Sequence, residues 1–306
     1  MKRRNITLTA IVLGLALSLN CASGKKPEPF NPEPYYAPES YMMVEGMRTC
    51  YLEAGDGEAL ILVHGWCGNA FNWMDVFDDF AEDYHTIALD LPGSGKSGCA
   101  PGKHYDVMFY SDFVARFMDE LGIEKAHLVG HSMGGHVAAM FALRHPERLD
   151  KLVLVDAAGL GAEPGPMALA SRLLTPPLII PMIHLIFPVT EEGLATVPAS
   201  ERKRVELAEE RYGSELRACT GQALSQSMKS ISRDLIKNRL KEIHARTLVV
   251  WCEDDDLLPV ESASVYQEGI KEAELIIIKS CSHSPMQCRP EKFSQAVKEF
   301  LASPPD

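Results

Sequence analysis

A serine stands between two glycines in a pattern suited to nucleophilic catalysis. Ser132 follows the apolar run 126–129 and lies two positions from both Gly130 and Gly134. A serine exposed on a tight strand-to-helix turn needs small flanking residues, because a Cβ there would collide with the adjoining backbone. The helical pattern VAAMFALRH follows the turn. The spacing therefore predicts a strand, a sharp turn that presents the Ser132 hydroxyl, and a helix.

His283 is the best placed partner for this serine. A serine hydroxyl is a weak nucleophile at neutral pH and needs a base, which a carboxylate in turn holds and supports. Of the ten histidines, His283 is the one that follows the last strand-like run, 273–278. Others have ordinary positions, such as His127 on a strand pattern and His145 at a helix end. We therefore predict that His283 is the base.

The carboxylate has several candidates. Three adjacent aspartates at positions 254–256 follow one strand-like run, and Asp156 follows the strand-like run before it. Each of these positions offers a carboxylate on a loop after a strand. The residue types alone leave the choice open.

The elements that must position these residues alternate along the chain from Tyr41 onward. Short strand-like runs followed by helical patterns are typical of a mostly parallel sheet covered by helices. A hairpin is predicted over 42–54, with further strands over 59–64, 84–90, 125–130, 151–156, 246–252 and 273–278. Helices are predicted over 70–82, 107–121, 133–145, 260–269 and 289–301. We therefore predict an α/β fold with an eight-stranded, mostly parallel sheet flanked by helices.

One long segment interrupts this alternation. No strand pattern appears over 158–240, where helical patterns such as 201–211 dominate. Within it, the apolar stretch 173–189 carries four prolines, which make it a poor continuous membrane helix. We predict a helical cap over 158–240, inserted into a core made of 41–157 and 241–306.

The first twenty residues indicate export. Three basic residues at positions 2–4 precede the apolar run 6–19. This pattern is typical of a signal peptide over 1–20, and the run is short for a membrane span, which needs about 20 residues. A retained N-terminal anchor is the alternative.

A cysteine and a Pro-rich stretch follow the apolar run. The sequence LSLNC, which ends at Cys21, resembles a relaxed form of the bacterial lipobox, in which the cysteine is lipidated. The alternative is a chance cysteine behind an ordinary signal peptide. Five prolines within 25–40 favour extended backbone, so we expect 21–40 to be a tether. These features predict a location at the periplasmic or cell-surface face of a bacterial membrane.

Four motifs together resemble the α/β-hydrolase fold family over about residues 44–301. They are the G-x-S-x-G turn at 130–134, the H-G-x loop at 64–66, the D-x-x-G-x-G-x-S turn at 90–97, and W-C-x-x-D-x-x-x-P at 251–259, where the family has W-G-x-x-D-x-x-x-P. The family orders its catalytic residues as serine, acid, histidine along the chain.

The resemblance implies a role for further residues. It places Asp255 on the family's acid, with Asp156 as an alternative, because some family members are thought to carry their acid after the preceding strand. It also implies that the backbone amides of Trp66 and Met133 bind the developing oxyanion. Ser132 excludes the branches of the family that use an aspartate nucleophile.

The predicted function is a serine hydrolase that cleaves a carboxylic ester, with a small, rather apolar molecule as substrate and no cofactor or metal. A net charge of −12 argues against a nucleic-acid partner. Hydrolysis of a C–C or amide bond is the enzymatic alternative, because these reactions use the same machinery. An inactive lipoprotein that keeps the fold as a binding module is the alternative from another class.

The eight cysteines add one structural hypothesis. An exported protein can oxidise its thiols. The resemblance places Cys252 and Cys288 on neighbouring loops near the catalytic residues, at positions where the family has other residue types. This suggests a Cys252–Cys288 disulfide; the alternative is that these cysteines are small buried apolar residues.

Overall fold

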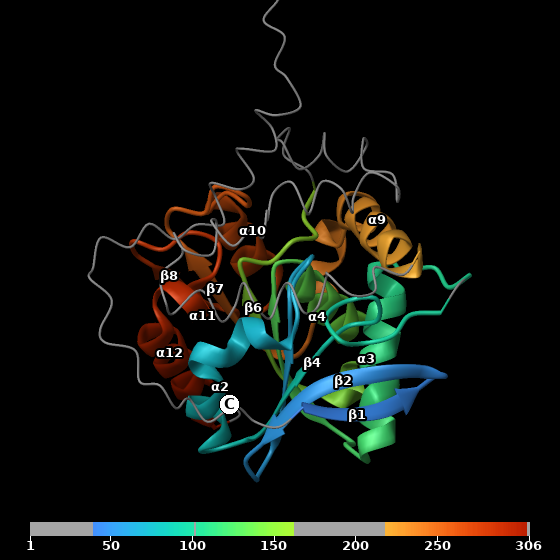
Figure 1. Ribbon diagram of the computed structural model, residues 1–306. Helices are drawn as coiled ribbons and strands as arrows, with labels where there is room; N and C mark the ends of the chain where they lie inside the picture. The colour runs from blue at the N-terminus through green and yellow to red at the C-terminus, as the bar shows by residue number, and fades with distance from the viewer. Residues whose placement is uncertain (1–38, 101, 162–217, 305–306) are drawn as a thin grey trace, which may run out of the picture.

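The computed structural model of this chain describes residues 39–100, 102–161 and 218–304. Within them, an eight-stranded sheet runs through the middle, with helices on both faces (Figure 1). The strand order is β1-β2-β4-β3-β5-β6-β7-β8. The predicted α/β class and the mostly parallel eight-stranded sheet are confirmed.

The sheet is antiparallel at one edge only. β1 pairs with β2 and β2 with β4 in antiparallel fashion, and every other neighbouring pair is parallel. The strands are β1 (Glu39–Val44), β2 (Met47–Ala54), β3 (Ala59–Val63), β4 (His85–Leu89), β5 (Ala126–His131), β6 (Leu149–Val155), β7 (Arg246–Cys252) and β8 (Glu274–Ile278). The helices are η1 (Ala70–Trp73), α2 (Met74–Ala81), α3 (Val107–Leu121), α4 (Met133–Arg144), η2 (Pro146–Arg148), α9 (Ala218–Arg233), η3 (Lys237–Glu242), α10 (Glu261–Gly269), α11 (Pro285–Cys288) and α12 (Pro290–Ala302).

The hydrophobic pattern of each strand matches its place in the sheet. β5 is buried at all six positions and β7 at six of seven, as expected for parallel strands covered on both faces. β1, at the edge, is buried at only one of six positions. The strand that leads to Ser132 therefore lies in the most buried part of the sheet.

Two apolar clusters fill the two faces. On β3, Ile61 and Val63 pack into the cluster that contains α3 and α4, whereas Leu60 and Leu62 pack into the cluster that contains α2 and α12. Successive strand residues point to opposite faces, so one short strand contributes to both clusters. Figure 1 shows these two helix pairs on opposite sides of the sheet.

The single helix predicted over 70–82 is wrong at its start. The chain first forms the 3-10 turn η1 and then α2. Asn69 and Asn72 cause this start, because the Asn69 side chain accepts from the Phe71 amide at 2.9 Å and the Asn72 side chain accepts from the Asn69 amide at 2.7 Å. These two side-chain bonds close a tight turn before the longer helix begins.

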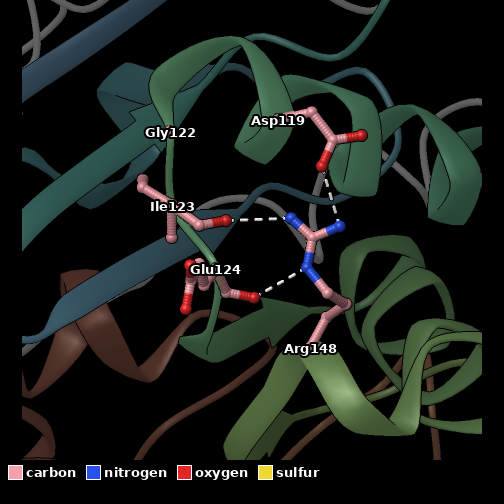
Figure 2. A pocket seen from close by; sticks show the side chains of 5 residues that line it. All are labelled: Asp119, Gly122, Ile123, Glu124 and Arg148. Carbon is pink, nitrogen blue, oxygen red and sulfur yellow. Dashed lines mark hydrogen bonds and ion pairs between the residues drawn. The ribbon is translucent and has the colours of Figure 1, made fainter.

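The turn between α3 and β5 is held by one arginine. Gly122 ends α3 with a φ of 70°, and the Arg148 guanidinium donates to the carbonyls of Ile123 (2.8 Å) and Glu124 (2.7 Å). Arg148 also pairs with Asp119 at 2.8 Å (Figure 2). The Arg148 contacts therefore hold the end of α3 to the sheet. The turn precedes β5, so the shallow hollow that these residues line lies at the amino edge of the parallel strands.

Several predicted features lie outside the described residues. These are the signal peptide, Cys21, the tether up to residue 38, and residues 162–217 of the predicted cap, including 173–189. In the part of the chain that the structure describes, no helix combines the length and apolar character of a membrane span.

Candidate active site

The predicted site residues come from four loops at one edge of the sheet. Trp66 follows β3, Ser132 follows β5, Asp255 follows β7 and His283 follows β8. These strands are parallel, so their carboxyl ends meet at the same edge, where ligands bind in open α/β sheets. The topology therefore brings residues that are 217 positions apart in sequence to one edge of the sheet.

Ser132 occupies the sharp turn between β5 and α4. Its φ of 54° and ψ of −116° are unusual for a residue with a side chain, and such strain costs on the order of 1–3 kcal/mol. The Ser132 amide donates to the Val155 carbonyl at 2.9 Å, which anchors the turn to β6. A Cβ on Gly134 would lie 2.6 Å from the His64 carbonyl oxygen and closer still to that of Val63. The glycine requirement predicted from the sequence thus has a direct steric cause.

The loop after β3 passes directly against the serine. A Cβ on Gly65 would lie 3.1 Å from Ser132 Cβ, so a side chain there would push the loop away from the serine. The Trp66 indole donates to the Leu224 carbonyl of α9 at 2.9 Å and fixes the loop from its other side. Met133 is the first residue of α4, so its amide is one of the unpaired donors at a helix start. The loop that carries Trp66 and the start of α4, which carries Met133, therefore both adjoin Ser132.

His283 and Asp255 are hydrogen-bonded to each other. His283 Nδ1 lies 2.8 Å from Asp255 Oδ2, and both residues are buried. The other carboxylate oxygen of Asp255 accepts from the amides of Leu257 (2.8 Å) and Leu258 (2.9 Å). With its proton on Nδ1, the imidazole keeps Nε2 as a base. Of the three adjacent aspartates, the structure brings Asp255 to the histidine.

The alternative acid, Asp156, lies beside this pair. It is fully buried at the end of β6, and its Oδ1 accepts from the Cys252 amide at 2.7 Å. Its Oδ2 has no hydrogen-bond partner among the described residues. Burial, and then the nearby charge of Asp255, raise the pKa of Asp156 well above its usual value. Burial and a second carboxyl nearby both disfavour a negative charge on Asp156, so its protonated form is favoured.

His131 is a part of the site that the sequence interpretation missed. Its Nε2–H donates to the His283 carbonyl at 2.6 Å, and the two rings lie 4.8 Å apart between centroids. Burial, with a smaller contribution from His283, lowers the pKa of His131 to about 3, so its ring is neutral at ordinary pH. Its place directly before Ser132 could have marked His131 as part of the site. Nothing in the sequence indicates that it contacts His283, 152 residues away.

A second buried histidine holds the loops under the site. The His64 ring donates from Nδ1 to the Gly65 carbonyl at 2.7 Å and accepts from the Leu91 amide at 3.1 Å. Asp90 in the same turn accepts from the amides of Ala70 and Lys96, each at 2.7 Å. The D-x-x-G-x-G-x-S motif therefore braces the loop that carries Trp66.

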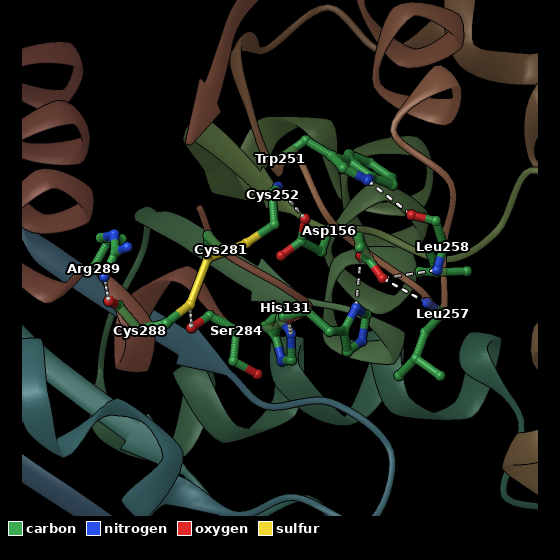
Figure 3. The surroundings of a disulfide bond; sticks show 12 residues. His131, Asp156, Trp251, Cys252, Leu257, Leu258, Cys281, Ser284, Cys288 and Arg289 are labelled. Carbon is green, nitrogen blue, oxygen red and sulfur yellow. Dashed lines mark hydrogen bonds and ion pairs between the residues drawn. A yellow bond between two sulfur atoms is a disulfide. The ribbon is translucent and has the colours of Figure 1, made fainter. Parts of the chain in front are cut away.

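The predicted Cys252–Cys288 disulfide is wrong. The structure brings the Cys281 sulfur into bonding contact with Cys252 and with Cys288, of which it can bond only one at a time, and Figure 3 shows Cys281 between the other two. The sequence interpretation overlooked Cys281, although this residue lies on the loop that separates the two predicted partners.

Two groups of described side chains have the residue types and proximity of metal ligands. One is formed by the three cysteines; the other is formed by His131, Asp156 and His283, with ligand atoms within 4.8 Å of one another. In the second group, each histidine already uses a ring nitrogen in a short hydrogen bond. This group is therefore better suited to orienting the His283 ring than to binding a cation.

Comparisons with known proteins agree with this geometry. Residues 58–176 match the family model described as alpha/beta hydrolase fold. A 2-hydroxy-6-oxo-6-phenylhexa-2,4-dienoate hydrolase of Comamonas testosteroni is 32% identical over 268 residues, which are 82% of this chain and 90% of the relative. 

Solved structures give the same result. A bacterial membrane phospholipase A superposes with a TM-score of 0.71 at 30% identity, over 86% of this chain and 85% of that chain. A meta-cleavage product hydrolase of Pseudomonas fluorescens superposes with a TM-score of 0.67 at 26% identity, over 86% and 97% of the two chains. Together with the sheet order and the serine turn, these similarities show that the chain belongs to the α/β-hydrolase fold family.

Proposed function

We propose that this protein is a serine hydrolase that cleaves an uncharged or modestly polar carboxylic ester. Ser132 is the nucleophile, His283 the base and Asp255 the acid that orients it. The observation that carries the proposal is the 2.8 Å hydrogen bond between His283 Nδ1 and Asp255 Oδ2, at the sheet edge where Ser132 occupies its strained turn. A pair of this kind activates a nearby hydroxyl.

The reaction has two halves. His283 Nε2 takes the Ser132 proton while Oγ attacks the ester carbonyl, and the amides of Trp66 and Met133 bind the oxyanion. The alkoxide leaves with the proton from His283, which gives an acyl-enzyme. A water molecule then gives one proton to His283 and attacks the acyl carbon. The bond to Ser132 Oγ breaks, His283 returns the proton to that oxygen, and the carboxylic acid leaves.

Two observations support an ester as the substrate. A similar solved structure is named a membrane phospholipase A, and phospholipases A cleave esters. In addition, three exposed acidic side chains, Glu253, Asp254 and Asp256, surround Asp255 on its loop. Their charge repels substrates that carry a carboxylate and favours neutral esters.

C–C bond hydrolysis is the second candidate. It rests on the names of curated relatives, among them the dienoate hydrolase of Comamonas testosteroni and a 2-hydroxy-6-oxononadienedioate hydrolase of the same species, 30% identical over 269 residues. The same serine, histidine and acid serve this reaction, so the substrate distinguishes the two functions.

The location proposed for the enzyme is the periplasmic or cell-surface face of a bacterial membrane, with Cys21 lipidated and the segment 21–40 as a tether. The sequence features of the first forty residues support it. Metabolic labelling with a fatty acid tests it in full-length chains. Label in the wild type and none in Cys21→Ser is expected; equal label in both would contradict the anchor.

A fluorophosphonate probe tests the nucleophile. Such probes form a covalent bond with an activated serine. We expect labelling of the wild type and none of Ser132→Ala, with Ser284→Ala as a control that stays labelled. An unlabelled wild type would favour the binding module over an enzyme.

A substrate panel tests the bond that is cleaved. We expect turnover of p-nitrophenyl esters, with longer acyl chains preferred if the apolar stretch 173–189 lines the pocket. We expect little turnover of a 2-hydroxy-6-oxo-dienoate, which is measured by the loss of its absorbance. Faster turnover of the dienoate than of every ester would favour C–C hydrolysis instead.

A further inference from the structure

Three cysteines gather beside the His283–Asp255 pair. Cys252 ends β7, Cys281 lies on the loop after β8, and Cys288 ends α11. Their sulfur atoms all lie within 4.8 Å of one another (Figure 3). Cys252 and Cys281 are buried, at 0% and 3% exposure, whereas Cys288 is partly exposed.

Cys281 can bond to either neighbour but not to both at once. The structure pairs it with Cys252 and with Cys288, and the Cα–Cα distances are 5.0 Å and 6.0 Å. Both distances fall within the range of about 4.4–6.8 Å that a disulfide needs, so either bond fits the same backbone. A sulfur forms a single disulfide bond. The oxidised cluster therefore always contains one disulfide and one thiol next to it.

The hydrogen bonds indicate which sulfur is the thiol in the resting chain. Cys288 Sγ donates to the Ser284 carbonyl at 3.0 Å, a contact that suits an S–H group. Cys288 is also the member of the cluster that solvent can reach. The buried pair, Cys252 and Cys281, is then the disulfide.

We propose that this cluster is a thiol–disulfide exchange site with Cys288 as the attacking thiol. The Cys288 thiolate attacks the sulfur of Cys281 and the Cys252–Cys281 bond breaks, while the new bond joins Cys281 to Cys288. The electron pair of the broken bond leaves with Cys252, which takes up the proton that Cys288 gave up. The step needs no oxidant, and small thiols and disulfides reach the site through Cys288. It does not depend on the proposed hydrolase activity.

Peptide mapping of the intact chain tests the proposal. Trypsin cleaves after Lys271 and Lys279, so Cys252 lies in one peptide and both other cysteines lie in the next but one. After alkylation at low pH, the resting form gives two cross-linked peptides with Cys288 alkylated. The exchanged form gives one peptide with an internal disulfide and Cys252 alkylated.

The chain is first mapped as purified and then after incubation with a buffer of reduced and oxidised glutathione. We expect the cross-linked form to dominate at first and the internal form to appear in the buffer. The variant Cys288→Ser should give the cross-linked form alone, and Cys252→Ser the internal form alone. Cys50→Ser, which changes a buried cysteine of β2, is the matched control and should exchange as the wild type does.

Three results would overturn the proposal. They are a single linkage that the buffer leaves unchanged, a Cys252–Cys288 linkage, and three free thiols after incubation with oxidised glutathione. If Cys252→Ser proves unstable, the wild type alone still decides, because the two linkages differ in peptide mass.

Discussion

At the scale of single residues, Asp156 and Asp255 show how position separates two identical groups. Asp255 accepts from His283 and from two amides, whereas Asp156 has one amide donor and an Oδ2 that has no partner among the described residues. The sequence supports both as candidate acids, because each follows a strand. Only the sheet order makes β6 and β7 neighbours and so brings the two carboxyls together.

The raised pKa of Asp156 predicts a pH-dependent stability. The unfolded chain ionises this carboxyl near pH 4, whereas the native chain keeps it protonated to higher pH. Between these two pKa values the native state binds more protons, so the free energy of unfolding falls as pH rises, by up to about 1.4 kcal/mol per pH unit. Asp156→Asn keeps a side-chain oxygen that accepts from the Cys252 amide, and it removes this pH-dependent loss of unfolding free energy. Its stability relative to the wild type should therefore grow as pH rises above about 4.

Urea unfolding between pH 4 and pH 8 measures this difference. Asp254→Asn is the control, because it removes one carboxylate whose side chain is exposed. A constant difference between wild type and Asp156→Asn over the whole range would contradict a protonated Asp156.

His131 is predicted to be a positioning residue. Its Nε2–H holds the His283 carbonyl, and its low pKa keeps this donor unchanged over the assay range. His131→Ala frees that loop, so kcat on the best ester should fall by an order of magnitude or more while KM stays near the wild-type value. His131→Gln restores an N–H donor and should recover part of the loss. A change in KM alone would place His131 in substrate binding instead.

At the scale of elements, the serine turn depends on how closely β3 and α4 approach. The Gly134 Cα faces the carbonyls of Val63 and His64, so Gly134→Ala forces backbone apart and should destabilise the fold by about 3 kcal/mol. Gly122→Ala is the matched control. Gly122 differs from the helical Gly134 in having a positive φ, of 70°, and it has no atom within 4 Å of its missing Cβ, so the cost there should be about 1 kcal/mol and come from backbone conformation alone.

Thermal unfolding of both variants measures the two costs. A loss at Gly134 no larger than that at Gly122 would mean that the close approach of β3 does not require a glycine at this position.

The elements themselves were largely predictable from the sequence. Strands such as β5 and β7 are apolar at nearly every position, so their place in the interior follows from composition. The start of α2 was not predictable in the same way. The side chains of Asn69 and Asn72 have to meet the backbone to form η1, and a hydrophobic pattern does not record such bonds.

At the scale of the whole molecule, pairings between distant segments escape sequence analysis. Family motifs mark Ser132 and Asp255, and the place of His283 after the last strand marks the base, whereas His131 contacts a carbonyl 152 residues away with no motif to show it. The cysteines follow the same rule. Cys281 lies between Cys252 and Cys288 because β7 and β8 are neighbours, whereas the family resemblance suggested the wrong pair.

The position of the disulfide predicts a difference in stability between two variants of the cluster. The Cys252–Cys281 bond closes a loop with a sequence separation of 29, whereas the Cys281–Cys288 bond has a separation of 7. A longer closed loop restricts the unfolded chain more, and the two separations differ by about 1 kcal/mol in the chain-entropy model. Oxidised Cys288→Ser, which keeps the long loop, should therefore be more stable than oxidised Cys252→Ser.

Chemical unfolding of both variants, oxidised and reduced, measures this difference. Reduction removes the bond from each, so comparing each variant with its own reduced form separates the effect of the bond from the effect of the lost cysteine packing.

The Cys252–Cys281 bond also joins the end of β7 to the loop that carries His283. Cys252 lies three residues before Asp255, and Cys281 lies two residues before His283. Reduction of Cys288→Ser should therefore lower kcat more than reduction of Cys252→Ser. Equal effects on stability would mean that the two bonds constrain the unfolded chain alike. Equal effects on kcat would mean that the loop that carries His283 needs no covalent link to β7.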